Sequence, residues 1–219
     1  MFLRMGRALK NLAQIPQVPV YWENAKNELM KRDRIMRKLI PKFGDLYLMG
    51  RDDSFTTLTR SIVAQQVSAK AANALWQSVL AICPNPTPIQ IIRAGHEKLS
   101  SCGLSKRKTE YILDLAEHFK EKRVHVDNWI TMSDEDVIAE LIQIRGIGRW
   151  TAEMFLIFNL LRPNILPLDD PGLLSGISIN YFSGEPVSRS DLREVAANWE
   201  PWRTVATWYL WRSQDPISN

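Results

Sequence analysis

The sequence contains little cysteine and no long hydrophobic run. Its 219 residues include two cysteines, Cys83 and Cys102, which are too few for a disulfide framework and are not spaced as paired metal ligands. No stretch stays apolar for long enough to span a bilayer, and polar residues interrupt the basic segment 1–17, unlike a secretion signal. We therefore expect a cytoplasmic protein that has no membrane partner and no bound metal.

Alternating apolar and polar residues, the pattern of a half-buried strand, are also missing. Apolar residues instead recur at helical spacing, and 45% of the residues are hydrophobic, enough for a substantial core. Ser54, Ser68 and the Ser133–Asp136 pair are the expected starts of three helices. We predict an all-α fold, with helices over 21–43, 54–66, 69–82, 88–101, 105–122, 133–143 and in several segments between 149 and 212.

Two of the ten glycines, Gly146 and Gly148, flank a single isoleucine in the stretch IRGIGRWTA. Glycine inside a helix costs roughly 1 kcal/mol relative to alanine, so this pair indicates a turn between two helices. In such a helix-hairpin-helix, amide N–H groups at the start of the second helix suit an anion such as a DNA phosphate. A tight loop between two packed helices explains the glycines equally well. The net charge of +4 permits a polyanionic partner without requiring one.

Three ordered motifs carry a resemblance to a known family. IRGIGRWTAEMFLIF followed by LPLDD resembles the helix-hairpin-helix superfamily of DNA base-excision glycosylases, specifically the AlkA-like 3-methyladenine DNA glycosylase II branch. SIVAQQVSAKAANALW and WEPWRTVATWYLW resemble further segments of that branch, so the likeness covers roughly residues 50–212. It implies that the protein binds double-stranded DNA, acts as a monomer, and is cytoplasmic and associated with the nucleoid.

The resemblance also implies two helical lobes with an active-site cleft between them. Residues 1–53 would pack with a C-terminal lobe, 163–219, that carries the catalytic aspartate. Residues 54–162 would form the central lobe with the hairpin. The expected contacts to DNA phosphates are Gly146, Gly148, Arg149 and Thr151.

Asp170 is the expected catalytic residue. Cleaving an N-glycosidic bond builds positive charge on the sugar, so an ionised carboxylate nearby stabilises the transition state and can orient or deprotonate water. The resemblance assigns this role to the second aspartate of LPLDD. Asp170 also precedes Pro171, a common start of a helix, and a cap at a helix N-terminus is compatible with the catalytic role.

The resemblance further implies a pocket for a base that is rotated out of the duplex. Trp150, Met154 and Trp202 would line this pocket, and tryptophan is the best aromatic face for a cationic, alkylated purine. Gln66 would fill the gap left in the base stack, with Gln65 bracing the backbone. As ordinary helix residues, both glutamines have an equally plausible structural role. The remaining tryptophans Trp76, Trp208 and Trp211 are expected in the core.

Relatives that also nick the strand, such as endonuclease III, carry a lysine nucleophile where this chain has Trp150. Tryptophan cannot form a Schiff base, so we expect a monofunctional hydrolase. Two cysteines cannot hold an iron–sulfur cluster, and we expect no cofactor. The superfamily allows a monovalent cation at the hairpin carbonyls, although the sequence has no ligand signature for it. The alternatives are a non-catalytic DNA-binding module and a glycosylase for a deaminated base.

Overall fold

The structure is a computed structural model that describes residues 18–50 and 53–215. The regular elements in these residues are all helices, and none is a strand, so the all-α prediction is confirmed. No helix in these ranges combines the length and apolarity needed to cross a membrane. Segment 1–17 lies outside the described residues. The helices are α1 Trp22–Arg32, α2 Arg34–Leu39, α3 Ser54–Ala64, α4 Ala69–Ile82, α5 Pro88–Ser101, α6 Lys106–Lys120, α7 Asp134–Leu141, α8 Arg149–Phe158, α9 Pro171–Tyr181, α10 Arg189–Ala197 and α11 Arg203–Arg212, with short 3-10 helices at Ile40–Phe43 and Val126–Asn128.

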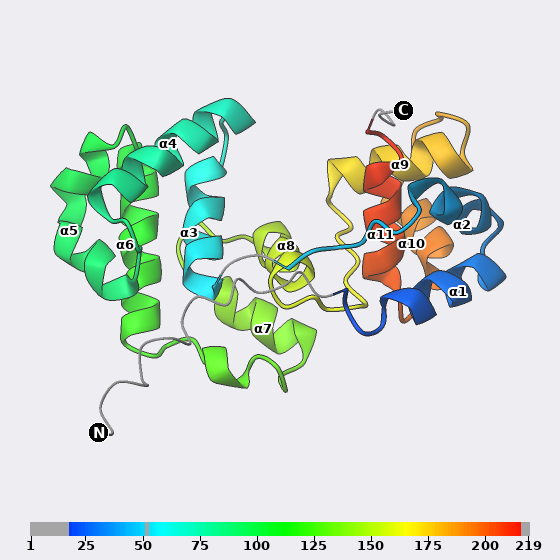
Figure 1. Cartoon of the computed structure of the whole chain (residues 1–219), viewed down its shortest axis with the longest axis horizontal. Helices are drawn as coiled ribbons and strands as arrows, with labels where there is room; N and C mark the ends of the chain where they lie inside the picture. The colour runs from blue at the N-terminus through cyan, green and yellow to red at the C-terminus, as the bar shows by residue number, and fades with distance from the viewer. Residues whose placement is uncertain (1–17, 51–52, 216–219) are drawn as a thin grey trace, which may run out of the picture.

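The helices form two groups that lie at opposite ends of the molecule (Figure 1). Helices α3 to α8 are consecutive in the chain, with α5 packed against α6, α3 against α4 and α6, and α7 against α8. The other group combines both ends of the chain, because α11 packs against α1 as well as α9. We propose residues 53/54 and 162/163 as the limits of these groups.

Trp22 shows why the two ends of the chain associate. Its indole is 1% exposed and lies edge-on to Trp208, with ring centroids 5.2 Å apart, and against Tyr209 at 5.9 Å. Aromatic pairs at such distances contribute about 0.5–1.5 kcal/mol beyond the area they bury. This cluster fixes α1 on α11.

The single helix predicted over 21–43 breaks at Asp33. The Asp33 carboxylate caps α2 by accepting two backbone N–H groups of its first turn. Its other oxygen accepts hydrogen bonds from the Tyr181 hydroxyl at 2.6 Å and the Trp199 indole at 3.0 Å. The aspartate therefore starts a second helix and joins it to the C-terminal helices, a tertiary contact that helical spacing does not reveal.

The predicted helix starts are largely correct. Ser68 caps α4 as expected, and Ser133 caps α7 with its hydroxyl also bonded to the Asp136 carboxylate. For α3 the prediction is wrong by one residue, because Asp53 caps this helix and Ser54 is its first residue. Aspartate and serine are about equally good caps, so a neighbouring pair cannot be ranked from sequence.

Candidate active site

Asp170 ends the irregular segment 159–170 and is the N-cap of α9. Its Oδ1 accepts a hydrogen bond of 2.6 Å from the backbone N–H of Leu173, and Pro171 takes the first helical position. The side chain is only 6% exposed. The local sequence causes this start, since aspartate is a preferred cap and proline fits the first turn. The predicted cap is therefore confirmed.

Two indole N–H groups from other helices converge on the same carboxylate. Trp150, in the first turn of α8, donates to Oδ2 of Asp170 at 2.9 Å. Trp211, near the end of α11, donates to Oδ1 at 2.6 Å. With the backbone N–H at the start of α9, three helices each contribute one N–H donor, the partner that an ionised carboxylate accepts.

A cavity of about 720 Å³ opens beside this carboxylate. Ligand pockets commonly measure about 300–1,000 Å³. The cavity lies between the two groups of helices, since α3 and α8 contribute one wall and the segment before α9 and α11 contribute the other. Its lining residues are Arg60, Ser61, Ala64, Gln65, Gln66, Trp150, Thr151, Met154, Phe158, Asp170 and Trp211.

Most of the predicted site residues lie together in this cavity. Trp150, Met154 and Asp170 line it with Thr151, and Gln66 lies at its exposed edge. Gln66 adopts a left-handed backbone conformation with φ of 56°, which is uncommon for a residue other than glycine. This turn directly follows α3 and leaves the side chain at the surface.

Trp202 does not line this cavity, so its prediction as a pocket residue is wrong. Its indole stacks on Tyr21, with ring centroids 6.0 Å apart and an interplanar angle of 19°, and donates to Glu28 at 2.9 Å. Trp211 takes the place in the cavity instead, which also corrects its assignment to the core. Trp202 is the non-helical N-cap of α11, whereas Trp211 lies in the last turn of this helix, so the two indoles start from opposite ends of α11.

Phe158 is a lining residue that the sequence prediction missed. It stacks on Trp211, with centroids 5.7 Å apart and an interplanar angle of 13°. A signal was available, because Trp150, Met154 and Phe158 recur every four residues and share one face of α8. The predicted pocket could have been extended by one turn along this face.

The helix-hairpin-helix consists of α7, the turn 142–148 and α8. Gly146 has a φ of 85°, and a Cβ there would lie 2.2 Å from the Tyr111 ring. Gly148 is different: it is the N-cap of α8 with ordinary φ, and a Cβ there would have no neighbour within 4 Å. The first glycine is thus required by the protein's own packing, whereas the second keeps the start of α8 open.

The segment before Gln66 is tied to this turn. The Gln65 amide donates to the backbone carbonyl of Gly146 at 2.8 Å, so Gln65 braces the hairpin as well as its own helix end. Lys108 donates to the carbonyl of Val63 at 2.8 Å, and burial lowers the pKa of this lysine. These contacts hold the end of α3 and the hairpin at a fixed spacing.

The Arg149 side chain forms ion pairs with two carboxylates. Its guanidinium forms a two-pronged ion pair with Glu135 and bonds Glu153 through Nε at 3.0 Å. The hydrogen bond to Glu135 is the main cause that raises the pKa of Arg149, and burial raises the pKa of Glu153. The Arg149 guanidinium is thus exposed but already paired, and no side chain caps the start of α8.

The described residues contain no group of three or more histidine, cysteine or acidic side chains arranged to hold a metal ion. Both cysteines are buried as free thiols. None of the residues that line the cavity is a lysine. The chemistry available there consists of the Asp170 carboxylate, the Arg60 guanidinium, aromatic faces and polar groups such as Gln65, Gln66 and Thr151.

A helix-hairpin-helix next to a buried carboxylate in an aromatic-lined cavity is the arrangement expected from the resemblance to helix-hairpin-helix DNA glycosylases. A family model described as "HhH-GPD superfamily base excision DNA repair protein" matches residues 59–202, and the chain belongs to this superfamily.

Individual relatives agree with this membership. The chain is 32% identical to "DNA-3-methyladenine glycosylase 1" of Schizosaccharomyces pombe, over 80% of this chain and 79% of that protein. It is similar to a crystal structure of a DNA-3-methyladenine glycosidase from Bacillus halodurans, with a TM-score of 0.80 and 35% identity over 86% of this chain and 87% of that one. The S. pombe enzyme Mag1 in complex with abasic DNA gives a TM-score of 0.75 at 29% identity, over 89% of this chain and 98% of that one.

Proposed function

We propose that this protein is a monofunctional DNA glycosylase that removes alkylated purines of the 3-methyladenine type from duplex DNA in base excision repair. The observation that carries the proposal is the Asp170 carboxylate, held by three N–H donors in a tryptophan-lined cavity beside the hairpin. The names of the S. pombe and B. halodurans relatives support the substrate class. The protein would act as a monomer on DNA inside the cell.

The reaction breaks the bond between C1′ of the deoxyribose and the purine nitrogen, and the electron pair leaves with the base. Positive charge then develops on the sugar, and the Asp170 carboxylate stabilises it from a site that needs no reorganisation. A water molecule adds its oxygen to C1′ while Asp170 orients it and accepts or relays its proton. The products are a free base and an abasic site.

Recognition follows from the aromatic walls of the cavity. A purine rotated out of the duplex would stack against Trp150 and Trp211, beside Met154. Alkylation at N3 or N7 makes the purine cationic, and the indole faces attract a cation. Gln66, exposed at the end of α3, would fill the space left in the duplex.

The hairpin would hold the DNA through its backbone. The N-terminal N–H groups of α8, from Gly148 to Thr151, would bind a phosphate, and the space beside Gly148 allows it to approach. Gly146 would shape the turn. The Arg149 side chain is occupied by carboxylates, so its part in this contact would be that of its backbone N–H.

The absence of a lysine from the cavity lining supports hydrolysis without strand cleavage. Borohydride reduction during turnover would trap no covalent complex between the protein and DNA. A trapped complex would replace the monofunctional assignment with a lyase.

The decisive experiment incubates the protein with methylated duplex DNA and separates released bases by chromatography. Wild type is expected to release 3-methyladenine, and Asp170→Asn is expected to release at least about a hundredfold less at equal DNA occupancy. Release by the variant at the wild-type rate would remove the role of Asp170. If the protein bound DNA but released no methylated base, two alternatives would remain: a glycosylase for another lesion, such as a deaminated base, or a non-catalytic DNA-binding module.

A further inference from the structure

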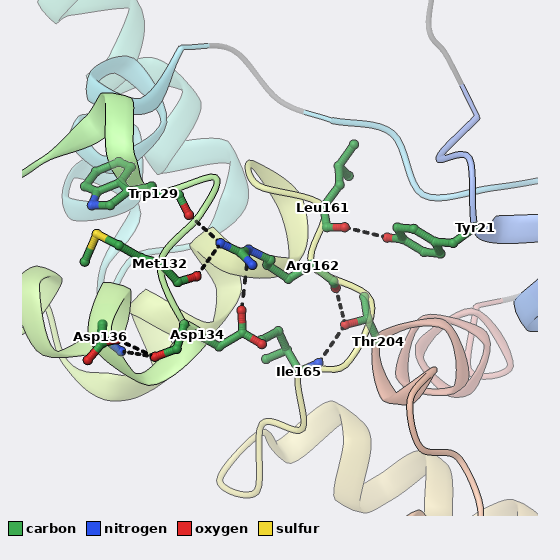
Figure 2. Close-up of polar contacts among 10 residues, drawn as sticks. Tyr21, Trp129, Met132, Asp134, Asp136, Leu161, Arg162, Ile165 and Thr204 are labelled. Carbon is green, nitrogen blue, oxygen red and sulfur yellow. Dashed lines mark hydrogen bonds and ion pairs between the residues drawn. The ribbon is translucent and has the colours of Figure 1, made fainter.

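Arg162 lies in the segment that joins α8 to α9 and carries Asp170 at its end. Figure 2 shows its side chain reaching into the loop before α7, while its backbone faces α11. The residue is held on α8 as well, because its backbone N–H donates to the carbonyl of Leu156 at 2.9 Å. Arg162 thus contacts three helical regions at the point where the chain passes from the hairpin to the catalytic aspartate.

On the hairpin side, the guanidinium has three partners. Its Nη2 donates to the carbonyls of Trp129 and Met132, the latter at 3.0 Å, and its Nε lies 3.4 Å from the Asp134 carboxylate (Figure 2). Asp134 is the first residue of α7. These contacts fix the connecting segment to the start of the first hairpin helix.

On the opposite side, the backbone of the segment is fixed to α11 through Thr204. The Thr204 hydroxyl donates to the Arg162 carbonyl at 2.6 Å and accepts from the Ile165 N–H at 2.9 Å. The Thr204 N–H donates to the Pro163 carbonyl at 3.0 Å. Thr204 is fully buried, and α11 is the helix whose Trp211 donates to Asp170.

The guanidinium cannot be removed without consequence for its partners. The Oδ1 atom of Asp134 is buried and has no hydrogen bond, so the ion pair with Arg162 is its compensation. Burial raises the pKa of Asp134, and the charge of Arg162 opposes this rise. Without the guanidinium, two carbonyls and one buried carboxylate oxygen lose their partner, which costs free energy for each group.

We propose that Arg162 is a positioning residue that sets the spacing between the hairpin and the Asp170 carboxylate. The inference deepens the proposed function and rests on it. DNA held by the hairpin presents its sugar at a place fixed by α8, whereas Asp170 is fixed by α9 and α11. Arg162 links the helices that hold the DNA to the helices that hold Asp170, and it thereby sets the distance between the carboxylate and the sugar. A misplacement of about 1 Å can reduce a rate by about a hundredfold.

The first test measures the spacing without any reaction. Spin labels are attached at Lys106→Cys on α6 and Ser190→Cys on α10, which are exposed positions in the two groups, while the native cysteines are buried. Arg162→Met is expected to broaden or shift the distance distribution, and Arg162→Lys is expected to do so less. A distribution in Arg162→Met equal to that of wild type would overturn the proposal.

The second test separates positioning from folding. Single-turnover release of methylated base by Arg162→Met should fall about 10- to 100-fold, while affinity for an abasic-site duplex changes little and Arg162→Lys recovers part of the rate. The matched control is Arg123→Met, which removes a surface ion pair with Glu121. A purely structural role would lower the unfolding free energy but leave the rate of folded enzyme unchanged, against the proposal.

The two proposals fail separately. If wild type released no methylated base, the proposed function would fail, and the label distances would still show whether Arg162 sets the spacing. If wild type were active and Arg162→Met kept both rate and spacing, only the positioning role would fail.

Discussion

At the scale of single residues, the structure confirms one of the two compatible roles that the sequence predicts for Asp170, that of a helix cap. The same Oδ1 atom that caps α9 also accepts the Trp211 indole, while Oδ2 accepts Trp150. A cap fixes the carboxylate against a helix N-terminus, whose dipole favours a negative charge. The structural role therefore holds the carboxylate in the state that the proposed catalytic role requires.

Trp150→Phe tests the contribution of one of these donors. The variant keeps an aromatic face in the cavity but removes the N–H that donates to Oδ2. Hydrogen bonds to charged groups contribute about 1.5–3 kcal/mol, so the single-turnover release of methylated base should fall about tenfold or more.

Trp76→Phe is the matched control, since Trp76 is buried on α4 and does not line this cavity. It should leave the release rate of folded enzyme unchanged. An undiminished rate in Trp150→Phe would show that this hydrogen bond does not orient the carboxylate.

Residue types were easier to predict from the sequence than the direction in which a side chain points. The face of α8 that carries Trp150 and Met154 follows from helical spacing. The choice between Trp202 and Trp211 does not, because it depends on how α1 packs against α11 and the residue before it. This packing is decided by contacts between residues nearly the whole chain apart, such as Trp22 with Trp208.

At the scale of elements, the hairpin shows two glycines with different physical requirements. Gly146→Ala should lower the free energy of unfolding by about 2 kcal/mol or more, because φ is 85° and the new Cβ would meet the Tyr111 ring. Gly148→Ala should cost no more than about 1 kcal/mol, since alanine is merely a poorer cap than glycine.

Urea unfolding of the two variants measures this difference directly. Gly148→Ala should nevertheless weaken binding to duplex DNA, because its Cβ occupies the space through which a phosphate would approach. Equal losses of stability in both variants would contradict the distinction.

The contacts between Glu140 on α7 and the loop before this helix make the free energy of unfolding depend on pH. Burial alone would raise the pKa of Glu140, but hydrogen bonds from His125 and Trp129 outweigh it and bring the pKa below its ordinary value of 4.5. A lowered folded-state pKa means that the stabilisation is fully present above the ordinary value and is lost as the pH falls through the lowered one.

Glu140→Gln should therefore reduce the unfolding free energy at pH 7, and its difference from wild type should shrink below about pH 4. Chemical unfolding across this pH range measures the effect. Glu194→Gln, an exposed position on α10, is the control and should show no such trend. A constant difference for Glu140→Gln at all pH values would contradict the assignment.

At the scale of the whole molecule, helix positions and the all-α class follow from spacing and caps, and the motif order predicts which segments form the site. The spacing of apolar residues could not predict the hydrogen bonds between segments that are far apart in the chain. Asp33 with Trp199 and Arg162 with Trp129 are examples, since each joins segments that are far apart in the chain through a side-chain hydrogen bond.

The lobe built from both ends of the chain has a consequence for synthesis. Helices α3 to α8 can pack as soon as they leave the ribosome, whereas α1 and α2 must wait for α9 to α11. Trp211, which holds Asp170, is among the last described residues to be made. A polypeptide released before that point could still form the helix-hairpin-helix, yet its Asp170 carboxylate would lack the hydrogen bond from Trp211. We therefore expect prematurely terminated copies to bind damaged DNA without removing the damaged base.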